Sequence, residues 1–464
     1  MNNKKKFKMP HLLWIMTGLI MLASICTYII PAGQFATNEA GQIMGDSFSY
    51  LGYQTPVSPW RAIYMFSDGL TGSGFIIFTV MAMGANVALI LETGAVDDFL
   101  NWTIYKLKDK GEGVLISILF CLMVYLGGFG GSDALIAVVP IGLLFTKKLK
   151  LDPIVAIGVT TYATLIGFGT GPTRQVTTQM LMDVPAYSAF ITRFLFMNLF
   201  MIVGLVLLLR YVKKVKKDPT KSLMYGNGWN PDEVSIGAEE FSLIKEVKLS
   251  WRTIAIMGIF FGQYVVIVVF GGTGMELYNF MVAVSLVSAV IAGIIGKMGP
   301  EELANGIVKG LVDMAFVGFV IGLARVMSLV MTDGNIIHTI VYTLTRPLMG
   351  LPKSVSSIGM TIIIAVINPF IPSASSKAAI LVPIIKPIAE TLNLAPQLAV
   401  QAFQFGDGFT NLISPALGWT VGSCVMANVP FDKWIKWVLP KVLFFMILSF
   451  ILMFILTTVG WGVV

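Results

Sequence analysis

The sequence predicts an all-α polytopic membrane protein made of two repeats with opposite membrane orientation, each holding a re-entrant hairpin and a discontinuous helix. Three observations lead to this fold class. The chain of 464 residues is 56% hydrophobic, which is more apolar surface than one soluble core can bury. Its apolar residues occur in runs of membrane-spanning length. The second half of the chain also repeats the spacing of prolines in the first half.

Seven apolar runs of roughly 20 residues are long enough to cross a ~30 Å hydrocarbon core as continuous helices. Two longer runs, 153–182 and 396–426, are interrupted by glycine, proline and polar residues, and we interpret them as discontinuous helices. The continuous crossings are predicted at 12–30, 73–92, 189–210, 252–270, 277–297, 312–331 and 434–460.

Two units between these crossings, 113–147 and 354–390, each contain two short apolar arms around a tip rich in glycine or proline. The tips read GGFGGSD (127–133) and NPFIPSASSK (368–377). Two arms of this length do not both cross a bilayer comfortably. We therefore predict two re-entrant hairpins whose tips lie at membrane depth inside the protein.

The charge pattern divides the chain into four parts and orients it. The net charge of +7 lies mainly in short loops on one side of the predicted membrane, which is typical of topology rather than of nucleic-acid binding. This predicts a multi-pass protein of a bacterial inner (cytoplasmic) membrane. The parts are a cytoplasmic N-terminus (1–11), a first membrane half (12–210), a basic cytoplasmic linker (211–251) and a second membrane half (252–464).

The repeat is visible as a constant offset of 243 residues between the two halves. An odd number of crossings in each half makes the two copies enter the membrane in opposite directions, an arrangement typical of secondary transporters. A chance match between low-complexity apolar segments is the alternative, but several prolines and a serine in one register favour a repeat. The matched pairs are Pro140 and Pro383, Pro153 and Pro396, Pro172 and Pro415, and Ser132 and Ser375.

Polar residues at the two breaks and the two hairpin tips are the candidate substrate-binding residues. A break in a membrane helix frees backbone groups and ends of half-helices, which can bind a charged solute. The alternative is a kink that only helps the helices to pack. The candidates are Ser132, Asp133, Thr170, Thr173 and Arg174 in the first half, and Arg325, Ser373, Ser375, Ser376, Lys377, Asp407, Thr410, Asn411 and Ser414 in the second.

Charged candidates are informative because an ionised group inside a bilayer costs at least ~2.5 kcal/mol. Arg325 lies on a helix face of small residues, and it either contacts the substrate or forms an ion pair with an acid such as Asp407. Lys377 either binds substrate or extends towards water. Asp407 and Asn411 are also candidates for coupling to Na⁺ or protons. No organic cofactor and no resident metal ion is expected.

The mixture of acidic and basic candidates suits a zwitterionic amino acid or, if the basic groups dominate, a dicarboxylate. The residues alone leave this choice open. Enzyme chemistry is not expected, because the only histidines, His11 and His338, lie far in sequence from a nucleophile such as Ser132 and no HExxH motif occurs. An ion channel stays an alternative, since broken helices also line pores.

Three segments resemble the YfcC-like branch of the anaerobic four-carbon-dicarboxylate carriers, within the ion transporter superfamily. They are AFQFGDGFTN (402–411), NPFIPSASSKAAILVPI (368–384) and the N-terminal MPH with TYIIPAG (9–33). The resemblance implies scaffold helices around a mobile unit that moves like an elevator, commonly in a homodimer. It also implies transport of dicarboxylates or, as in some YfcC-like members, exchange of basic amino acids such as arginine and ornithine.

The first half departs from this branch. Its hairpin tip has GGSD where the branch leads us to expect an acidic pair, and FGTGPTRQ (168–175) replaces a break containing serine and asparagine. The first half-site is therefore the less transferable one. We expect a secondary active antiporter of a small carboxylate-bearing metabolite, with amino acids preferred over dicarboxylates because Asp407 and Asp133 can accept an amine.

Overall fold

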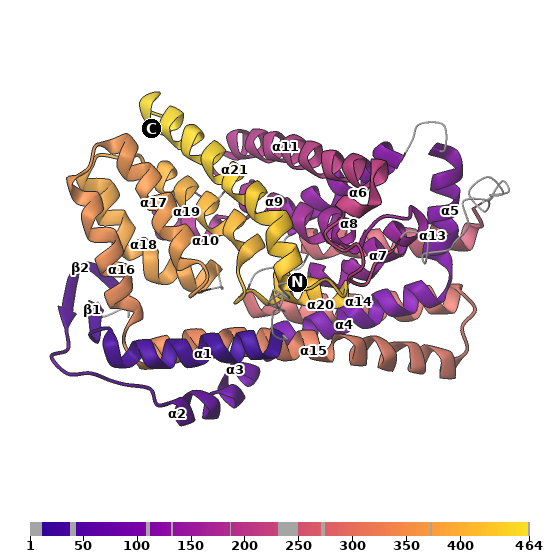
Figure 1. Cartoon of the computed structure of the whole chain (residues 1–464), viewed down its shortest axis with the longest axis horizontal. Coiled ribbons are helices and arrows are strands. Elements are labelled where there is room, and N and C mark those ends of the chain that lie inside the picture. The colour runs from indigo at the N-terminus through magenta and orange to yellow at the C-terminus, as the bar shows by residue number, and fades with distance from the viewer. Residues whose placement is uncertain are drawn as a thin grey trace, which may run out of the picture.

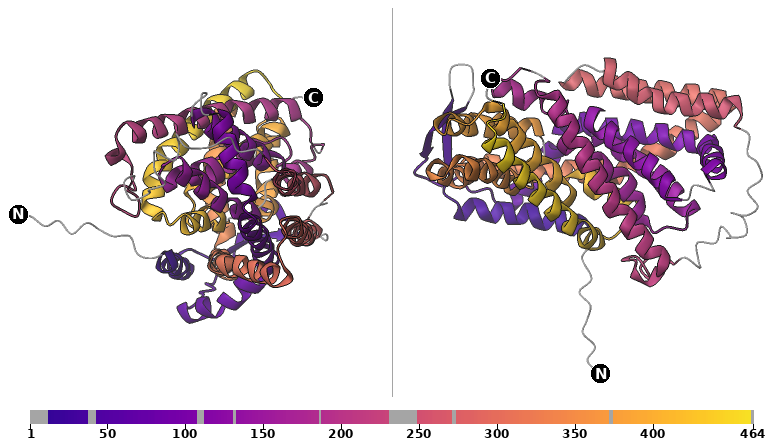
Figure 2. Two further views of the ribbon diagram at one scale, coloured as in Figure 1. Left: turned by 90° about the vertical axis from the view of Figure 1, so that its right-hand side faces the viewer. Right: turned by 90° about the horizontal axis from the view of Figure 1, so that it is seen from above.

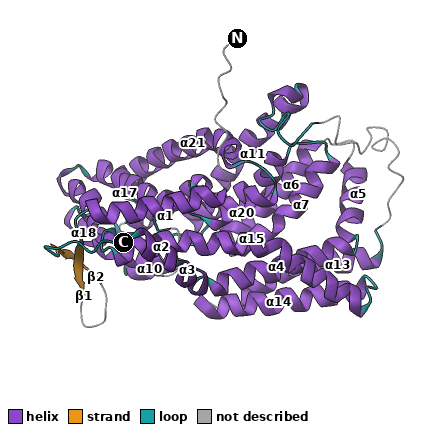
Figure 3. Cartoon of the chain, turned by 60° about the horizontal axis from the view of Figure 1, so that its bottom comes forward, coloured by secondary structure: helices purple, strands orange, loops and turns teal. Residues whose placement is uncertain are grey.

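A computed structural model describes residues 12–37, 43–107, 112–130, 133–185, 187–230, 249–270, 274–371 and 374–462. Helices make up most of this part of the chain (Figure 3). In the first half they are α1 Leu12–Ile29, α2 Pro59–Tyr64, α3 Phe66–Gly72, α4 Gly74–Glu92, α5 Ala95–Leu107, α6 Glu112–Tyr125, α7 Val139–Lys148, α8 Pro153–Ile157, α9 Ala163–Thr170, α10 Val176–Leu181 and α11 Phe190–Lys217.

The second half is built in the same way. Its helices are α13 Trp251–Phe270, α14 Gly274–Ile295, α15 Pro300–Asp333, α16 Ile337–Thr345, α17 Lys353–Ile367, α18 Ala374–Thr391, α19 Pro396–Thr410, α20 Gly418–Met426 and α21 Phe431–Thr458. Short 3₁₀ or π segments join several of them, among them η2 Leu126–Gly130, η3 Asp133–Val138, η4 Gly158–Tyr162 and η7 Asn411–Ile413.

Within the described ranges, seven helices are long and apolar enough to cross a membrane. Two differences from the predicted crossings stand out. The first arm of the first predicted hairpin reaches spanning length as Glu112–Phe129, whereas α1 and α13 hold shorter apolar stretches. The re-entrant hairpins therefore stay a prediction. The seven are Gly74–Glu92, Glu112–Phe129, Pro153–Thr170, Phe190–Lys217, Tyr278–Ile295, Pro300–Asp333 and Phe431–Thr458.

The described part of the predicted all-α fold also contains a small β-hairpin after α1. Strand β1 (Gly33–Thr37) pairs antiparallel with β2 (Ile43–Tyr50). Phe35 and Phe48 oppose each other across the strands, with ring centroids 5.2 Å apart, and Phe48 stacks on Tyr342 of α16 at 4.1 Å. These aromatic contacts give the hairpin an apolar face to bury, and such cross-strand pairs stabilise short sheets.

The long helix α15 extends along one side of the molecule and runs beside α4 (Figure 1). It begins at Pro300 rather than at the predicted 312, and its 34 residues extend about 50 Å at 1.5 Å per residue. Glycines allow close packing here: a Cβ on Gly310 would lie 2.4 Å from the Cα of Ala85, and one on Gly318 would lie 2.7 Å from Ile77. The face of small residues on this helix is thus a helix-contact face.

A closed ring of buried hydrogen bonds joins α4 to α13 and α14. Gln263 Nε2 donates to Asn86 Oδ1 at 3.0 Å, Asn86 Nδ2 donates to Ser288 Oγ at 2.8 Å, and Ser288 Oγ donates to Gln263 Oε1 at 2.8 Å. Polar side chains that satisfy one another in this way hold membrane helices together without leaving a polar atom exposed to hydrocarbon.

The helix bounds follow the predicted 243-residue offset. The first broken helix begins at Pro153 and the second at Pro396, and α7 ends at Lys148 where α18 ends at Thr391. Both breaks are present, because α9 stops at Thr170 before α10 begins, and α19 stops at Thr410 before α20 begins. The opposite insertion of the two halves stays a prediction.

The two broken helices meet at the centre of the molecule. Gly169 of α9 and Gly408 of α19 touch so closely that a Cβ on Gly408 would lie 2.0 Å from the Cα of Gly169. Gln404 Nε2 donates across the same contact to the carbonyl of Gly171 at 2.7 Å.

Beyond the crossing, each half lends a segment to the other. Helix α10 packs on α18 and α19, and α20 packs against η3 and α7 (Figures 1 and 2). Thr161 of η4 and Ser423 of α20 share a hydrogen bond of 2.6 Å, and Lys386 of α18 pairs with Asp183, two residues after α10. The exchange of segments interlocks the two halves.

Gly408→Ala is expected to lower the free energy of unfolding by about 1–3 kcal/mol, because overpacking at a close contact forces backbone shifts. Thermal unfolding in detergent measures the effect. Gly258→Ala is the matched control, since it lies within α13 with no atom within 4 Å of an added Cβ. Equal melting temperatures for the two variants would contradict the assigned contact.

Candidate functional site

Side-chain donors bind backbone carbonyls at and just before the break between α19 and α20. Thr410 Oγ1 donates to the carbonyl of Gly406 at 2.7 Å, and Thr420 Oγ1 donates to that of Asn411 at 2.6 Å. Trp434 Nε1, from α21, donates to the carbonyl of Leu412 at 2.8 Å. The break is therefore a fixed, polar element inside a buried region, as freed backbone groups in a membrane protein require.

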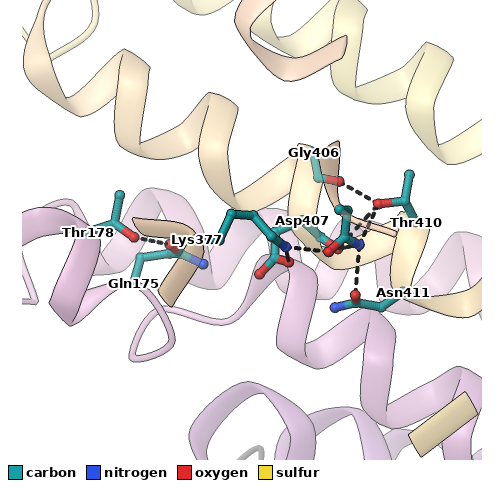
Figure 4. A network of polar contacts seen from close by, with 8 residues as sticks. Gln175, Thr178, Lys377, Gly406, Asp407, Thr410 and Asn411 are labelled. Atoms are coloured by element: carbon teal, nitrogen blue, oxygen red, sulfur yellow. Dashed lines mark hydrogen bonds and ion pairs between the residues drawn. The ribbon is translucent and has the colours of Figure 1, made fainter. Parts of the chain in front are cut away.

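A buried ion pair lies beside this break. Lys377 of α18 pairs with Asp407 of α19, and their side chains are 0% and 1% exposed. The lysine ammonium also donates to the side-chain oxygen of Asn368, which follows the last residue of α17 (Figure 4). One contact thus joins both arms of the second predicted hairpin to the broken helix.

Asn368 is the organising residue of this cluster. Its Nδ2 lies 3.0 Å from the carbonyl of Asp407, 2.7 Å from Thr410 Oγ1 and 2.7 Å from Asn411 Oδ1. Its Oδ1 accepts from Lys377. Both ends of this amide are used, so the side chain holds the lysine and the broken helix in one geometry.

Two polar atoms of the cluster have no hydrogen-bond partner within the part of the chain that is described. They are Asp407 Oδ2 and the hydroxyl oxygen of Ser414, both buried. Leaving a buried polar group unmatched costs free energy comparable to a lost hydrogen bond. These two atoms are consequently places where a polar or cationic ligand finds a partner already oriented.

The first half contributes a more apolar counterpart. Thr170 Oγ1 donates to the carbonyl of Ile166 in its own helix at 2.7 Å, and Thr173 Oγ1 donates to the carbonyl of Gly128 at 3.0 Å. The guanidinium of Arg174 lies over the ring of Phe168, 5.1 Å from its centroid. The two threonine hydroxyls therefore satisfy backbone carbonyls within the first half.

Apart from Thr170, Thr173, Arg174 and Arg325, the predicted site residues divide into three groups. Those brought together directly are Lys377, Asp407, Thr410 and Asn411, with Ser414 a few residues further along the break. Ser132 and Ser373 lie outside the described residues. Asp133 begins η3, and Ser375 and Ser376 lie in the first turn of α18, which places their backbones at the predicted tips.

Arg325 lies on α15, and its side chain lies against Gly72 of α3, where an added Cβ would be 2.7 Å from the Arg325 Nε. A Cβ on Gly418 would lie 2.3 Å from Ile321, one turn before Arg325, and the Nε of Arg325 has no hydrogen-bond partner among the described residues. The alternative of an ion pair between Arg325 and Asp407 is wrong, because the cation that reaches Asp407 is Lys377. Lys377 of α18 already supplies the positive charge beside Asp407. Lys377 also does not extend towards water.

Two residues with central hydrogen bonds, Asn368 and Arg193, are not among the predicted site residues. Asn368 carries the central hydrogen bonds, and its position before a proline at the end of an apolar run was the available signal. Arg193 is fully buried and donates to Gln397 Oε1 at 2.8 Å and to the carbonyl of Ser188 at 2.6 Å, which ties α11 to the start of α19. It falls near the predicted start of a crossing and was read as part of the span.

No group of three or more His, Cys, Asp or Glu side chains that could hold a metal ion occurs within the described ranges. The three cysteines, Cys26, Cys121 and Cys424, are free thiols. The site therefore offers a lysine, a carboxylate, amides and hydroxyls. These groups can bind a polar or charged solute.

The sequence model of the C4-dicarboxylate anaerobic carrier (DcuC) family matches residues 9–458. The chain belongs to this family. A relative from Escherichia coli strain K12, YfcC, which carries the provisional name of a basic amino acid antiporter, is 24% identical over 474 residues, covering 93% of each chain. The predicted resemblance to the YfcC-like carriers is thus confirmed.

Two further proteins are similar to this chain. YuiF of Bacillus subtilis strain 168, provisionally named an amino acid transporter, is 23% identical and covers 78% of this chain and 82% of its own. The structure of the YdaH transporter of Alcanivorax borkumensis aligns with a TM-score of 0.43 at 15% identity, covering 98% of this chain and 99% of that one. Since the present chain belongs to the DcuC family and has seven membrane-length apolar helices within the described ranges, it is a multi-pass membrane protein of a transporter family.

Breaking the buried pair from one side is expected to be more costly than removing both charges. Lys377→Met leaves Asp407 buried without its cation and should lower the free energy of unfolding by about 3–5 kcal/mol. The double variant Lys377→Met/Asp407→Leu should recover much of that loss, because it leaves no unpaired charge. Thermal and denaturant unfolding of the single and double variants measures the coupling. Strictly additive losses would show that the two side chains do not interact.

Proposed function

We propose that the protein is a secondary active transporter that exchanges amino acids, with basic amino acids such as arginine and ornithine as the preferred class. The observation that carries this proposal is the buried Lys377 and Asp407 pair, in which Asp407 Oδ2 has no partner among the described residues. The α-carboxylate and α-amine of an amino acid carry the same two charges as the pair itself.

Charge balance favours a zwitterion over a dicarboxylate at this place. An amino acid that divides the pair, with its carboxylate at Lys377 and its amine at Asp407, leaves the net charge of the site unchanged. A dicarboxylate adds two negative charges beside an acid, which is costly in a region of low dielectric. The second cation of a basic amino acid needs a further acid, and Asp133 in the first hairpin tip is the residue that the sequence offers.

Exchange or uptake of C4-dicarboxylates is the second candidate. The family description favours it, and Arg325, whose Nε has no hydrogen-bond partner in the described ranges, is a cation that could balance a second carboxylate. In this case Lys377 and Arg325 bind the substrate, with Arg174 as a further candidate, and Asp407 serves Na⁺ or proton coupling. Asn411 is the neighbouring oxygen ligand for such an ion.

The remaining features of the proposal follow from the predicted topology. The protein lies in the bacterial inner membrane with its N-terminus in the cytoplasm, and its two halves are inverted repeats. The hairpins and broken helices move like an elevator against the remaining helices of a homodimer. The joining of both hairpin arms to α19 through Asn368 supports treating these elements as one moving unit.

Counterflow in proteoliposomes tests the substrate class. Vesicles loaded with arginine plus ornithine, or with succinate plus fumarate, are scored for uptake of the matching labelled solute with and without a sodium gradient. Exchange of the amino acids alone supports the proposal. Movement of the dicarboxylates alone replaces it by the second candidate, and a sodium requirement identifies the coupling ion.

Asp407→Asn is expected to lower exchange by at least about tenfold, because a hydrogen bond to a charged group is worth about 1.5–3 kcal/mol. The neutral amide keeps the shape of the carboxylate but leaves Lys377 buried without its anion, so some stability should be lost. Exchange is therefore compared per amount of folded, membrane-inserted protein. Asp183→Asn is the matched control, since this exposed carboxyl pairs with Lys386 away from the site. Undiminished uptake by Asp407→Asn would remove this carboxylate from the binding site.

A further inference from the structure

A separate cavity lies away from the candidate site, between the first predicted hairpin and two neighbouring helices. It has a volume of about 180 Å³ and is enclosed by α5, α6, α7 with η3, and α13. Every side chain that lines it is hydrophobic. Phe99, Leu119, Met123, Ile141, Met257 and Phe260 represent the four walls.

A void of this kind is unusual and points to a hydrocarbon ligand. Protein interiors are close-packed, and atoms that line an empty space lose their dispersion contacts. An apolar cavity of about 150 Å³ stays dry and binds small hydrocarbons such as benzene. Water has no polar partner among the lining side chains here, so the occupant is apolar.

The cavity is next to surfaces that a membrane would cover. Ile118 of α6 lines it and is 55% exposed, and Ile254, one turn before Met257 on α13, is 58% exposed. These helices gather with α5 and α7 at one end of the molecule (Figure 1). In a membrane protein of this length and composition, such exposed apolar helix faces contact the hydrocarbon tails of lipids.

Charged groups of both signs lie near the ends of three helices that line the cavity. Lys148 at the end of α7 lies 2.6 Å from Asp97 at the start of α5, and Thr253 of α13 donates to the neighbouring Asp98 at 3.2 Å. Arg252 is adjacent to Thr253 and lies over the ring of Trp251. Three helix ends thus meet here, with Lys148 and Arg252 as the cations close to the apolar space.

We propose that this cavity binds one acyl chain of an anionic membrane phospholipid, with the headgroup at Lys148 and Arg252. The tail fills the space between the first predicted hairpin and α13. Cationic side chains next to a membrane attract anionic headgroups. The apolar side chains that line the cavity gain dispersion contacts with the methylene groups of the acyl chain. The site is independent of the Lys377 and Asp407 cluster and of the transported solute.

Photocrosslinking tests this assignment in the full-length protein. The protein is placed in nanodiscs of phosphatidylethanolamine and phosphatidylglycerol, the latter carrying a diazirine in its acyl chain, and is then exchanged into detergent to remove loosely bound lipid before irradiation. The expected result is label on peptides of α6 and α13 that line the cavity. Label distributed evenly over the lipid-facing helices would overturn the proposal.

Variants that fill the cavity sharpen the test. Each buried methylene changes affinity about fourfold, so Leu119→Trp, which excludes at least two of them, should lower retained label by about tenfold or more. Ile202→Trp on α11 is the control, because this residue is 58% exposed and does not line the cavity. Leu122→Phe replaces Leu119→Trp if the larger change does not fold. Equal labelling of filled and control variants would overturn the site.

The headgroup assignment has its own measurement. The double variant Lys148→Gln/Arg252→Gln should lose the preference for labelled phosphatidylglycerol over labelled phosphatidylcholine while tail labelling persists. An unchanged preference would overturn the assignment of the headgroup to these two residues.

Discussion

The buried ion pair of Lys377 and Asp407 is the constraint around which the centre of the molecule is organised. Moving two such charges out of water costs several kcal/mol each, and close contact with further hydrogen bonds is needed to offset that cost. Asn368 supplies those hydrogen bonds and connects the pair to Thr410 and Asn411. The hairpin arms and the broken helix α19 are therefore held together by electrostatics, in a region where apolar packing alone would let them slide.

The broken helices of the two halves are surrounded by different kinds of side chain. Subtracting the 243-residue offset places Thr164 opposite Asp407, Ala134 opposite Lys377 and Phe168 opposite Asn411. The first half instead relies on close backbone packing, since a Cβ on Gly127 would lie 2.0 Å from the carbonyl oxygen of Thr164. The second half thus carries most of the charged chemistry, and the first supplies a tightly packed partner for it.

The positions of the helix breaks and hairpin tips could be predicted from the sequence, because glycine, proline and polar residues interrupt apolar runs there. The breaks at Thr170 and Thr410 and the approach of Lys377 to the stretch 404–418 belong to this class. Partner choice could not be predicted, because linear spacing does not say which of two cations reaches Asp407. The β-hairpin at 33–50 and the early start of α15 were missed because their stabilising contacts come from distant segments, Tyr342 and α4.

Two polar clusters of the molecule differ in how completely their hydrogen-bonding atoms are satisfied. The ring of Asn86, Gln263 and Ser288 uses donors and acceptors on three neighbouring helices, which favours a single rigid packing. Around the break in α19, by contrast, Asp407 Oδ2 has no partner among the described residues. Folding gains nothing from such an atom, and burying it costs free energy. A solute that bound at Asp407 Oδ2 would recover that cost, and this is the physical argument for the proposed role of Asp407 in binding.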